Sequence, residues 1–174
     1  MSFAVFLSAN SRILYLIVYV WIPVVRACWS TIFTELPDDE MFEAIKNAQA
    51  DDFIKDLDSE VSQGGSNFSG GQKQRLSIAR TIIGKHSFYL FDDCFSALDV
   101  ATEKKIREKL REITKDSSVL LVSQRISTIK FADEIIVLDD GKIIDKGSHN
   151  ELKERCSLYK EILSSQLENI GGSL

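Results

Sequence analysis

The strongest constraint on this chain is the run Asn-Phe-Ser-Gly-Gly-Gln-Lys-Gln-Arg-Leu-Ser-Ile-Ala-Arg-Thr-Ile at residues 67–82. Ser69 is a favourable helix N-cap, and two glycines follow it. The apolar residues beyond them recur at helical spacing, at Leu76, Ile78, Ala79 and Ile82. The run predicts an amphipathic helix whose glycine-rich start suits an anionic oxygen, such as that of a phosphate. For Ser-Gly-Gly alone, an ordinary capped helix is the alternative.

A second pattern follows the predicted helix. Residues 87–91, Ser-Phe-Tyr-Leu-Phe, are aromatic and apolar, and they are bounded by charged residues on both sides. This predicts a buried strand that ends in Asp92 and Asp93. Carboxylates at the end of a buried strand are costly unless a cation uses them. For the pair alone, the alternative is a solvated turn.

Together these residues resemble the motifs of ABC-transporter ATPase domains. Residues 67–82 match the signature motif almost position for position, residues 87–93 resemble the Walker B strand, and Ser96-Ala97-Leu98-Asp99 resembles the D-loop at the expected spacing. The resemblance covers about residues 35 to 168. It implies an α/β fold, namely a P-loop NTPase core sheet with an inserted α-helical subdomain.

The rest of the chain continues the resemblance. Residues 119–123 predict a strand that leads to Gln124, at the position where most of the family carries a switch histidine. Residues 135–144 predict a hairpin around Asp139-Asp140-Gly141-Lys142. His149 is expected at a helix start and His86 in a loop before a strand, so neither is assigned to catalysis.

The resemblance implies a role for each matching residue. Ser69, Gly70, Gly71 and Gln72 would touch the γ-phosphate of a nucleotide held by the partner domain. Asp92 would hold Mg²⁺, Asp93 would be a weak general base, Gln124 would stand at the switch position, and Asp99 would stabilise the dimer interface. The cofactors implied are ATP and Mg²⁺.

Two departures from the family pattern occur together. Asp93 replaces the usual catalytic glutamate, and its carboxylate is one methylene shorter. Gln124 replaces a histidine and cannot accept a proton. This combination resembles the degenerate-site subunit of heterodimeric multidrug-type ABC exporters. It implies a second ABC ATPase domain as partner, transmembrane domains, and a location on the cytoplasmic side of the cell membrane.

The sequence contains no Gly-x-x-x-x-Gly-Lys-Ser/Thr P-loop and no recognisable Q-loop. We therefore expect the carboxy-terminal part of such a domain, inactive in ATP hydrolysis alone. The alternative is a non-enzymatic pairing module or a gene remnant. The expected division is an apolar N-terminal segment (1–34), a helical subdomain with the signature (35–84), the core part (85–168) and a tail (169–174).

The apolar run at residues 13–25 has thirteen residues, too few to cross a bilayer, which needs about 20. We expect residues 1–33 not to be family sequence; a short membrane anchor is the alternative. After them, residues 36–40 predict a helix start. Its apolar face would hold Met41, Phe42, Ile45 and Ala48. Residues 51–57 predict a second short helix.

The net charge of −5, without a basic stripe interleaved with aromatics, disfavours nucleic-acid binding. Cys28, Cys94 and Cys156 are widely spaced and form neither a Cys-x-x-Cys pair nor a zinc spacing. Their odd number suits a reducing cytosol.

Overall fold

The computed structural model describes residues 3–8, 36–62, 65–84 and 86–171, with residues 3–8 and 168–171 described by their backbone alone. The chain forms two compact units. The first comprises Met1–Ile13, Ser87–Asp93 and Asp116–Leu174, and the second comprises Leu14–His86 and Cys94–Lys115. The predicted α/β class is confirmed. The predicted boundaries at residues 34, 84 and 168 stay predictions.

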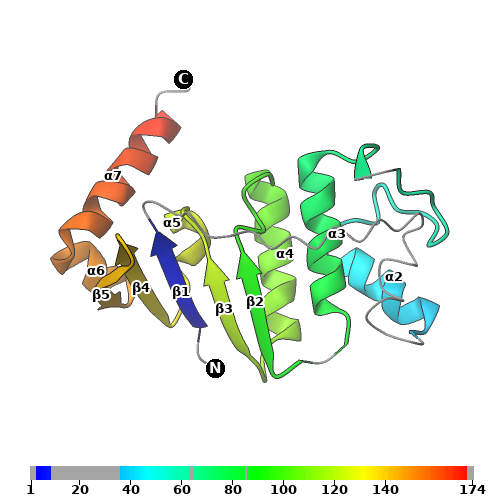
Figure 1. The fold of residues 1–174 in the computed structure, drawn as a ribbon, viewed down its shortest axis with the longest axis horizontal. Coiled ribbons are helices and arrows are strands. Elements are labelled where there is room, and N and C mark those ends of the chain that lie inside the picture. Colours follow the sequence, from blue (N-terminus) through cyan, green and yellow to red (C-terminus); the bar gives the residue numbers. More distant parts are fainter. Residues whose placement is uncertain (1–2, 9–35, 63–64, 85, 172–174) are drawn as a thin grey trace. The chain divides into compact units, whose positions relative to one another are not determined.

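The first unit is built on a five-stranded sheet in the order β2-β3-β1-β4-β5 (Figure 1). Its strands are β1 (Phe3–Ser8), β2 (Phe88–Asp92), β3 (Ser118–Val122), β4 (Glu134–Asp139) and β5 (Lys142–Gly147). The first four strands run parallel to their neighbours, and β5 pairs antiparallel with β4. The carboxyl ends of β1 to β4 therefore share one edge of the sheet, where ligands bind in open α/β sheets.

The strand β1 was not foreseen from the sequence. We expected residues 1–33 not to be family sequence and predicted no strand there, whereas Phe3–Ser8 pairs with both β3 and β4. Figure 1 shows β1, in blue, between these strands. The sequence of a parallel strand with neighbours on both sides is a short apolar run without alternating polar residues. Such a run is weak evidence for a strand, because a buried helix segment can have the same pattern. The apolar run at 13–25 and Cys28 lie outside the described residues.

The predicted hairpin is confirmed. Asp139 pairs with Lys142 across the turn, and both central residues have positive φ, 44° at Asp140 and 72° at Gly141. Positive φ at both positions is the type I′ geometry, whose twist matches that of the flanking strands. Glycine at the second position adopts this geometry at little steric cost.

Three helices accompany the sheet of the first unit: α5 (Ile126–Ile129), α6 (His149–Arg155) and α7 (Ser157–Gly171). One hydrophobic cluster joins residues of β4, α5, α6 and α7. Its buried members are Ile126, Ile129, Ile135, Val137, Leu152, Cys156 and Tyr159. This cluster fixes α7, whose side chains matter for the site.

The outer strand β2 is buried on one side only. Tyr89 and Phe91 are buried as predicted, whereas Phe88 and Leu90 are 56% and 55% exposed. In the described part of the chain β2 has one strand neighbour, β3. The prediction of a fully buried strand was therefore wrong for the alternate positions.

The second unit contains α2 (Asp38–Asn47), α3 (Gly70–Ile82) and α4 (Val100–Ile113). Helix α2 starts after Pro37 with three acids in its first turn, as predicted, since these residues complement the positive end of a helix. Met41, Ile45 and Ala48 are buried. Phe42 is 42% exposed, so its assignment to the apolar face was wrong.

Residues 51–57 form turns rather than the predicted helix. The chain leaves α2 through Gln49, whose φ is 55°, and the amide of Ile54 closes a single turn on the carbonyl of Ala50 at 2.9 Å. Ile54 and Leu57 are buried. These apolar side chains are thus buried from turns, without a helix.

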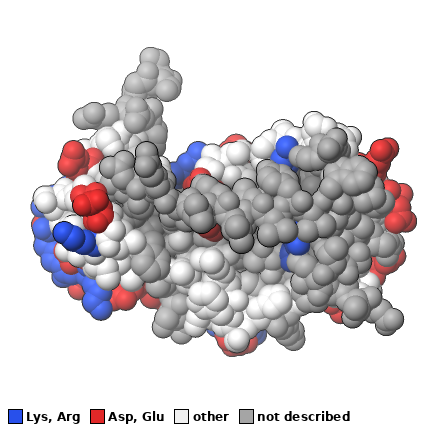
Figure 2. All heavy atoms as spheres, viewed as in Figure 1, with Lys and Arg blue, Asp and Glu red and all other residues white. Residues whose placement is uncertain are grey.

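Charges of both signs lie close together where β5 and α6 reach the surface (Figure 2). No helix in the described ranges is long and apolar enough to span a membrane.

Candidate functional site

The start of α3 is fixed by a reciprocal pair of hydrogen bonds. The Ser69 hydroxyl accepts from the Gln72 amide at 3.3 Å, and the Gln72 side-chain oxygen accepts from the Ser69 amide at 2.8 Å. This capping box confirms the predicted N-cap. The amides of Gly70 and Gly71 belong to the first turn, where no helical carbonyl precedes them as a partner. The turn contains no acidic residue, so its positive end is not neutralised.

Gly71 lies against the loop that resembles the D-loop. A Cβ atom at Gly71 would be 2.8 Å from the carbonyl oxygen of Ala97, closer than real Cβ contacts. At Gly70 the same atom would be 3.6 Å from the Ala97 side chain, an ordinary contact. The second glycine is therefore required for packing as well as suited to a ligand.

Gln74 joins the same two segments. Its side-chain nitrogen donates to the Ser96 hydroxyl at 2.8 Å, and its oxygen accepts from the Ala97 amide at 2.9 Å. Sequence reasoning missed this residue, because its partners lie more than twenty positions away. Gln74 thus joins the signature helix to the D-loop by two hydrogen bonds.

Arg75 secures the other side of α3. Its guanidinium donates to both oxygens of Asp52, at 3.0 and 3.1 Å, and to the carbonyl of Gln49. It also lies 4.7 Å from the centre of the Phe53 ring. A guanidinium can make these planar and stacked contacts together, which an ammonium cannot. The helical subdomain and the signature are therefore joined at this residue.

Asp99 begins α4. Its carboxylate accepts from the amides of Ala101 and Thr102, at 3.0 and 2.9 Å. The Thr102 amide and hydroxyl hold the pKa of this carboxyl below its ordinary value. The observed role of Asp99 is helix capping; its role at a dimer interface stays a prediction.

Asp92, Asp93 and Gln124 lie at one edge of the sheet. Asp92 is the last residue of β2 and pairs with Val122, two residues before Gln124. The Asp93 amide donates to the Val122 carbonyl at 2.9 Å, and Asp93 has φ of 46°. A left-handed conformation at a residue other than glycine is uncommon and occurs often at functional sites. The exposed Asp92 and Gln124 side chains and the partly buried Asp93 therefore belong to the same edge of the sheet, and their roles stay predictions.

The segment after β3 is held by α7. The Gln166 side chain accepts from the Ile126 amide at 2.9 Å and donates to the Gln124 carbonyl at 2.6 Å. Inside the segment, the Arg125 amide donates to the buried Ser123 hydroxyl at 3.1 Å. Sequence reasoning gave Gln166 no role, because its partners lie about forty positions away.

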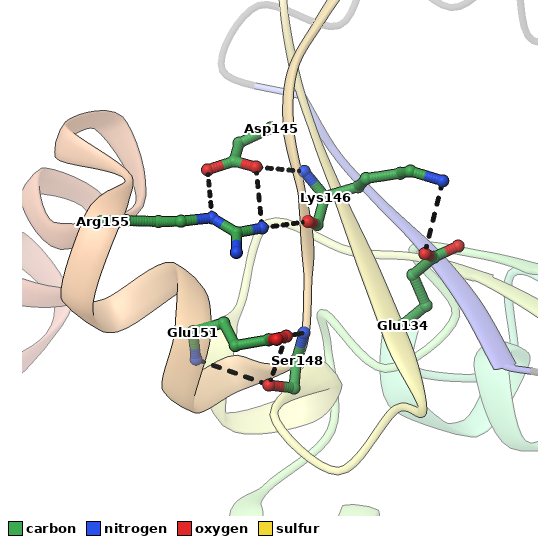
Figure 3. Close-up of polar contacts among 6 residues, drawn as sticks. All are labelled: Glu134, Asp145, Lys146, Ser148, Glu151 and Arg155. Atoms are coloured by element: carbon green, nitrogen blue, oxygen red, sulfur yellow. Dashed lines mark hydrogen bonds and ion pairs between the residues drawn. The ribbon is translucent and has the colours of Figure 1, made fainter.

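A polar network fixes the junction of β5 and α6 (Figure 3). The Arg155 guanidinium makes two hydrogen bonds of 3.1 Å to Asp145, and a third to the Lys146 carbonyl. These contacts hold the pKa of Asp145 below its ordinary value. Ser148 and Glu151 form a second capping box, which lowers the pKa of Glu151.

The histidines have structural surroundings. His149 is the first residue of α6, as predicted, and its Nδ1 lies 2.7 Å from the Tyr159 hydroxyl. Burial, with Lys153 and Lys130 nearby, lowers the pKa of His149, and burial raises the pKa of Tyr159 to about 12. His86 lies within 3.0 Å of the Ile83 carbonyl. No group of three or more possible metal ligands occurs in the described ranges. Cys94 is partly buried there, and Cys156 is buried.

Comparison with known proteins decides the family. The ABC transporter family model matches residues 22–96. An uncharacterized ABC transporter ATP-binding protein of Mycobacterium tuberculosis (strain ATCC 25618 / H37Rv) is 47% identical over 131 residues, covering 74% of this chain and 22% of the relative. The chain belongs to the ABC transporter ATP-binding family.

Other members extend the comparison. The ATP-dependent lipid A-core flippase of Francisella tularensis subsp. tularensis (strain SCHU S4 / Schu 4) is 35% identical over 138 residues, covering 77% of this chain and 23% of the flippase. A solved structure of a bacterial Atm1-family ABC exporter with ATP bound superposes with a TM-score of 0.78 and 34% identity, covering 83% of this chain and 26% of that chain. This ABC domain sequence spans about a quarter of the length of the relatives it matches.

The family match also corrects the expectation for the N-terminal region. It begins at residue 22, inside the stretch that we expected to be foreign to the family. Residues 22–33 are therefore ABC-family sequence. Their structure lies outside the described residues.

Proposed function

We propose that this chain supplies the signature, Walker B and switch segments of an ABC exporter, in which ATP binding and hydrolysis drive transport across a membrane. The observation that carries the proposal is the start of α3, where Gly70 and Gly71 present first-turn amides after the Ser69 cap, without an acidic neighbour. Such an end binds phosphate through its amides and its dipole. Related proteins named as a flippase and as an ATP-bound exporter support the class of activity.

In this proposal the signature acts on a nucleotide held by a second ATPase domain. Ser69, Gly70, Gly71 and Gln72 surround the γ-phosphate. The capping box leaves the Gly70 and Gly71 amides for the ligand while Gln72 holds the turn. Bracing by Gln74 would pass a change at the nucleotide to the D-loop. Asp99 would keep that loop in shape at the dimer interface by capping α4.

The sheet edge is proposed to face this chain's own nucleotide. Asp92 is exposed at the end of β2 and fits Mg²⁺, which commonly takes one or two carboxylates and completes its shell with water and phosphate oxygens. Bound Mg²⁺ would polarise the phosphate oxygens. Asp93 would act on the attacking water as a weak general base, and Gln124 would contact the γ-phosphate as a neutral hydrogen-bonding group.

The proposed partners follow from this division of roles. A second, catalytically intact ABC ATPase domain would complete the competent site in a heterodimer, and transmembrane domains would carry the substrate. The chain would then lie at the cytoplasmic face of the membrane. The relatives' names do not favour the alternative of a non-enzymatic pairing module.

The experiment is ATP-dependent association with the Mycobacterium tuberculosis relative, measured by sedimentation. Ser69→Asn and Ser69→Asp keep a good N-cap and differ by one charge. We expect association to persist with Ser69→Asn and to fall at least tenfold, which is about 1.4 kcal/mol, with Ser69→Asp, since its carboxylate would face the phosphate. Ser77→Ala, exposed on the same helix, is the control.

Equal association of the Ser69→Asn and Ser69→Asp variants would contradict the proposed contact between the signature motif and the phosphate. Association that does not depend on ATP would instead favour the pairing module. The sheet edge has its own test in a heterodimer in which this chain is joined to a matching P-loop half and the partner site is inactivated. There, Asp93→Glu with Gln124→His should raise ATP turnover, because Glu extends the carboxylate and His adds a titratable contact.

A further inference from the structure

We propose that Gln166 is a positioning residue for the switch segment, through which helix α7 sets the place of Gln124. One side-chain amide holds the segment at two points. Its oxygen accepts from the Ile126 amide at 2.9 Å, and its nitrogen donates to the Gln124 carbonyl at 2.6 Å. Both ends of a planar amide group are used, so the segment is fixed in position and in orientation.

The hydrogen bond to Ile126 replaces a missing cap. Helix α5 starts after Arg125, whose side chain makes no capping hydrogen bond. The first amide of a helix has no partner within the helix, and Ile126 is 2% exposed, so solvent is a poor substitute. Gln166, forty positions later in the chain, supplies the acceptor.

Helix α7 is a firm support for this contact. Tyr159 is fully buried in the hydrophobic cluster, and Ile162 and Leu163 pack against it. Residues 159, 162, 163 and 166 follow the i, i+3, i+4, i+7 spacing of one helix face. The packing that anchors α7 therefore also aims Gln166 at the switch segment.

The consequence concerns Gln124. Its main chain is held by Gln166, while its side chain is exposed at the sheet edge. Gln166 does not reach the reacting atoms; it acts through Gln124. The functional part of this inference rests on the switch role proposed for Gln124.

The test replaces Gln166 by methionine, which has similar length and loses both hydrogen bonds. Amide hydrogen exchange by NMR should show Ile126 exchanging about three- to tenfold faster, the factor expected for one net hydrogen bond. The Ile135 and Val137 amides of the same core should keep their rates. Ser164→Ala, which removes an exposed hydroxyl from the same helix, should leave Ile126 unchanged.

A second variant separates positioning from packing. In Gln166→Glu, the ionised carboxylate can accept from Ile126 but repels the Gln124 carbonyl, whereas the protonated acid can again donate. The Gln124 resonances should therefore return toward their wild-type positions as the pH falls through the pKa of the introduced carboxyl. That pKa should lie above the ordinary value of about 4.3.

The nucleotide response is measured on the same samples. The chain is joined to a matching P-loop half and paired with the relative used above. With Mg²⁺ and ATP added, the Gln124 side-chain resonances should then shift in the wild type and shift less in Gln166→Met. Unchanged Ile126 exchange in Gln166→Met would overturn the positioning role. The other outcome is that Ile126 exchange changes as expected in Gln166→Met while the Gln124 side-chain resonances of the wild type do not shift with ATP. That result would instead overturn the proposed function.

Discussion

Replacing Gly71 by alanine should destabilise the second unit, whereas the same replacement at Gly70 should not. The two residues are neighbours in the first turn of α3, but their surroundings differ. A Cβ at Gly71 would lie 2.8 Å from the Ala97 carbonyl oxygen, a main-chain atom that cannot rotate away. A Cβ at Gly70 would lie 3.6 Å from the Ala97 side chain, where no movement is needed.

The magnitude follows from two opposing terms. Alanine is favoured over glycine within a helix by about 0.5–1 kcal/mol, and both variants share that gain. The overlap at Gly71 forces the D-loop to shift, and overpacking of this kind costs about 1–3 kcal/mol. We therefore expect Gly70→Ala to match or exceed the wild type, and Gly71→Ala to be less stable than Gly70→Ala by about 1–3 kcal/mol.

The assay is urea unfolding of the three proteins, followed by circular dichroism at 222 nm. The comparison between the two alanine variants cancels helix propensity and leaves the contact with Ala97. Exchange of the Ala97 amide, which donates to Gln74, provides a local reading and should accelerate only in Gly71→Ala. Equal unfolding free energies for the two variants would refute the packing argument for Gly71.

Three further predictions concern the first unit. Val5→Pro should lower the unfolding free energy by on the order of 3 kcal/mol, because proline removes a hydrogen-bond donor from a strand that is paired on both sides. Thermal unfolding tests this, with Val5→Ala as the control. Equal unfolding midpoints for the two variants would contradict the central position of β1. Asp145 has a lowered pKa in the folded state, so its contribution to stability is present above its unfolded pKa of 3.8 and is lost as the pH falls through the folded pKa. In a plot of unfolding free energy against pH, Asp145→Asn should therefore flatten the slope on the acid side. An unchanged slope would contradict the contact with Arg155. His149 also has a lowered pKa, so at this residue the folded state binds fewer protons than the unfolded chain. The unfolding free energy should therefore fall as the pH drops below 6.5. His149→Gln should remove this pH dependence, and a pH dependence that persists would assign it to another group.

The sequence predicted the elements whose signals are local. Ser69 and its glycines predicted the start of α3, and the Asp-Asp-Gly turn predicted the β4–β5 hairpin, because caps and turns depend on a few adjacent residues. The strand β1 was missed because pairing with β3 and β4 joins residues more than 100 positions apart. The helix predicted at residues 51–57 was wrong: the segment forms turns, and Asp52 makes an ion pair with Arg75, a long-range contact that local propensity does not contain.

The same distinction between local and long-range contacts applies to the candidate site. Asp92, Asp93 and Gln124 were each predicted to follow a strand, and the parallel pairing of β2 with β3 brings those strand ends to one sheet edge. The residues that hold these segments could not be predicted. Gln74 and Gln166 find their partners 22 to 42 positions away, and no spacing rule connects them.

The two supporting residues share a chemistry that suits a phosphate site. Gln74 contacts the Ser96 hydroxyl and the Ala97 amide, and Gln166 contacts the main chain on both sides of Arg125. A carboxamide supplies one donor group and one acceptor at fixed separation, so a single side chain can hold a loop at two points. A carboxylate would supply acceptors alone and place a negative charge beside the segments proposed to meet ATP, whereas an ammonium would supply donors alone. Glutamine holds these loops without charge, and the positive end of α3 keeps its full attraction for an anionic oxygen.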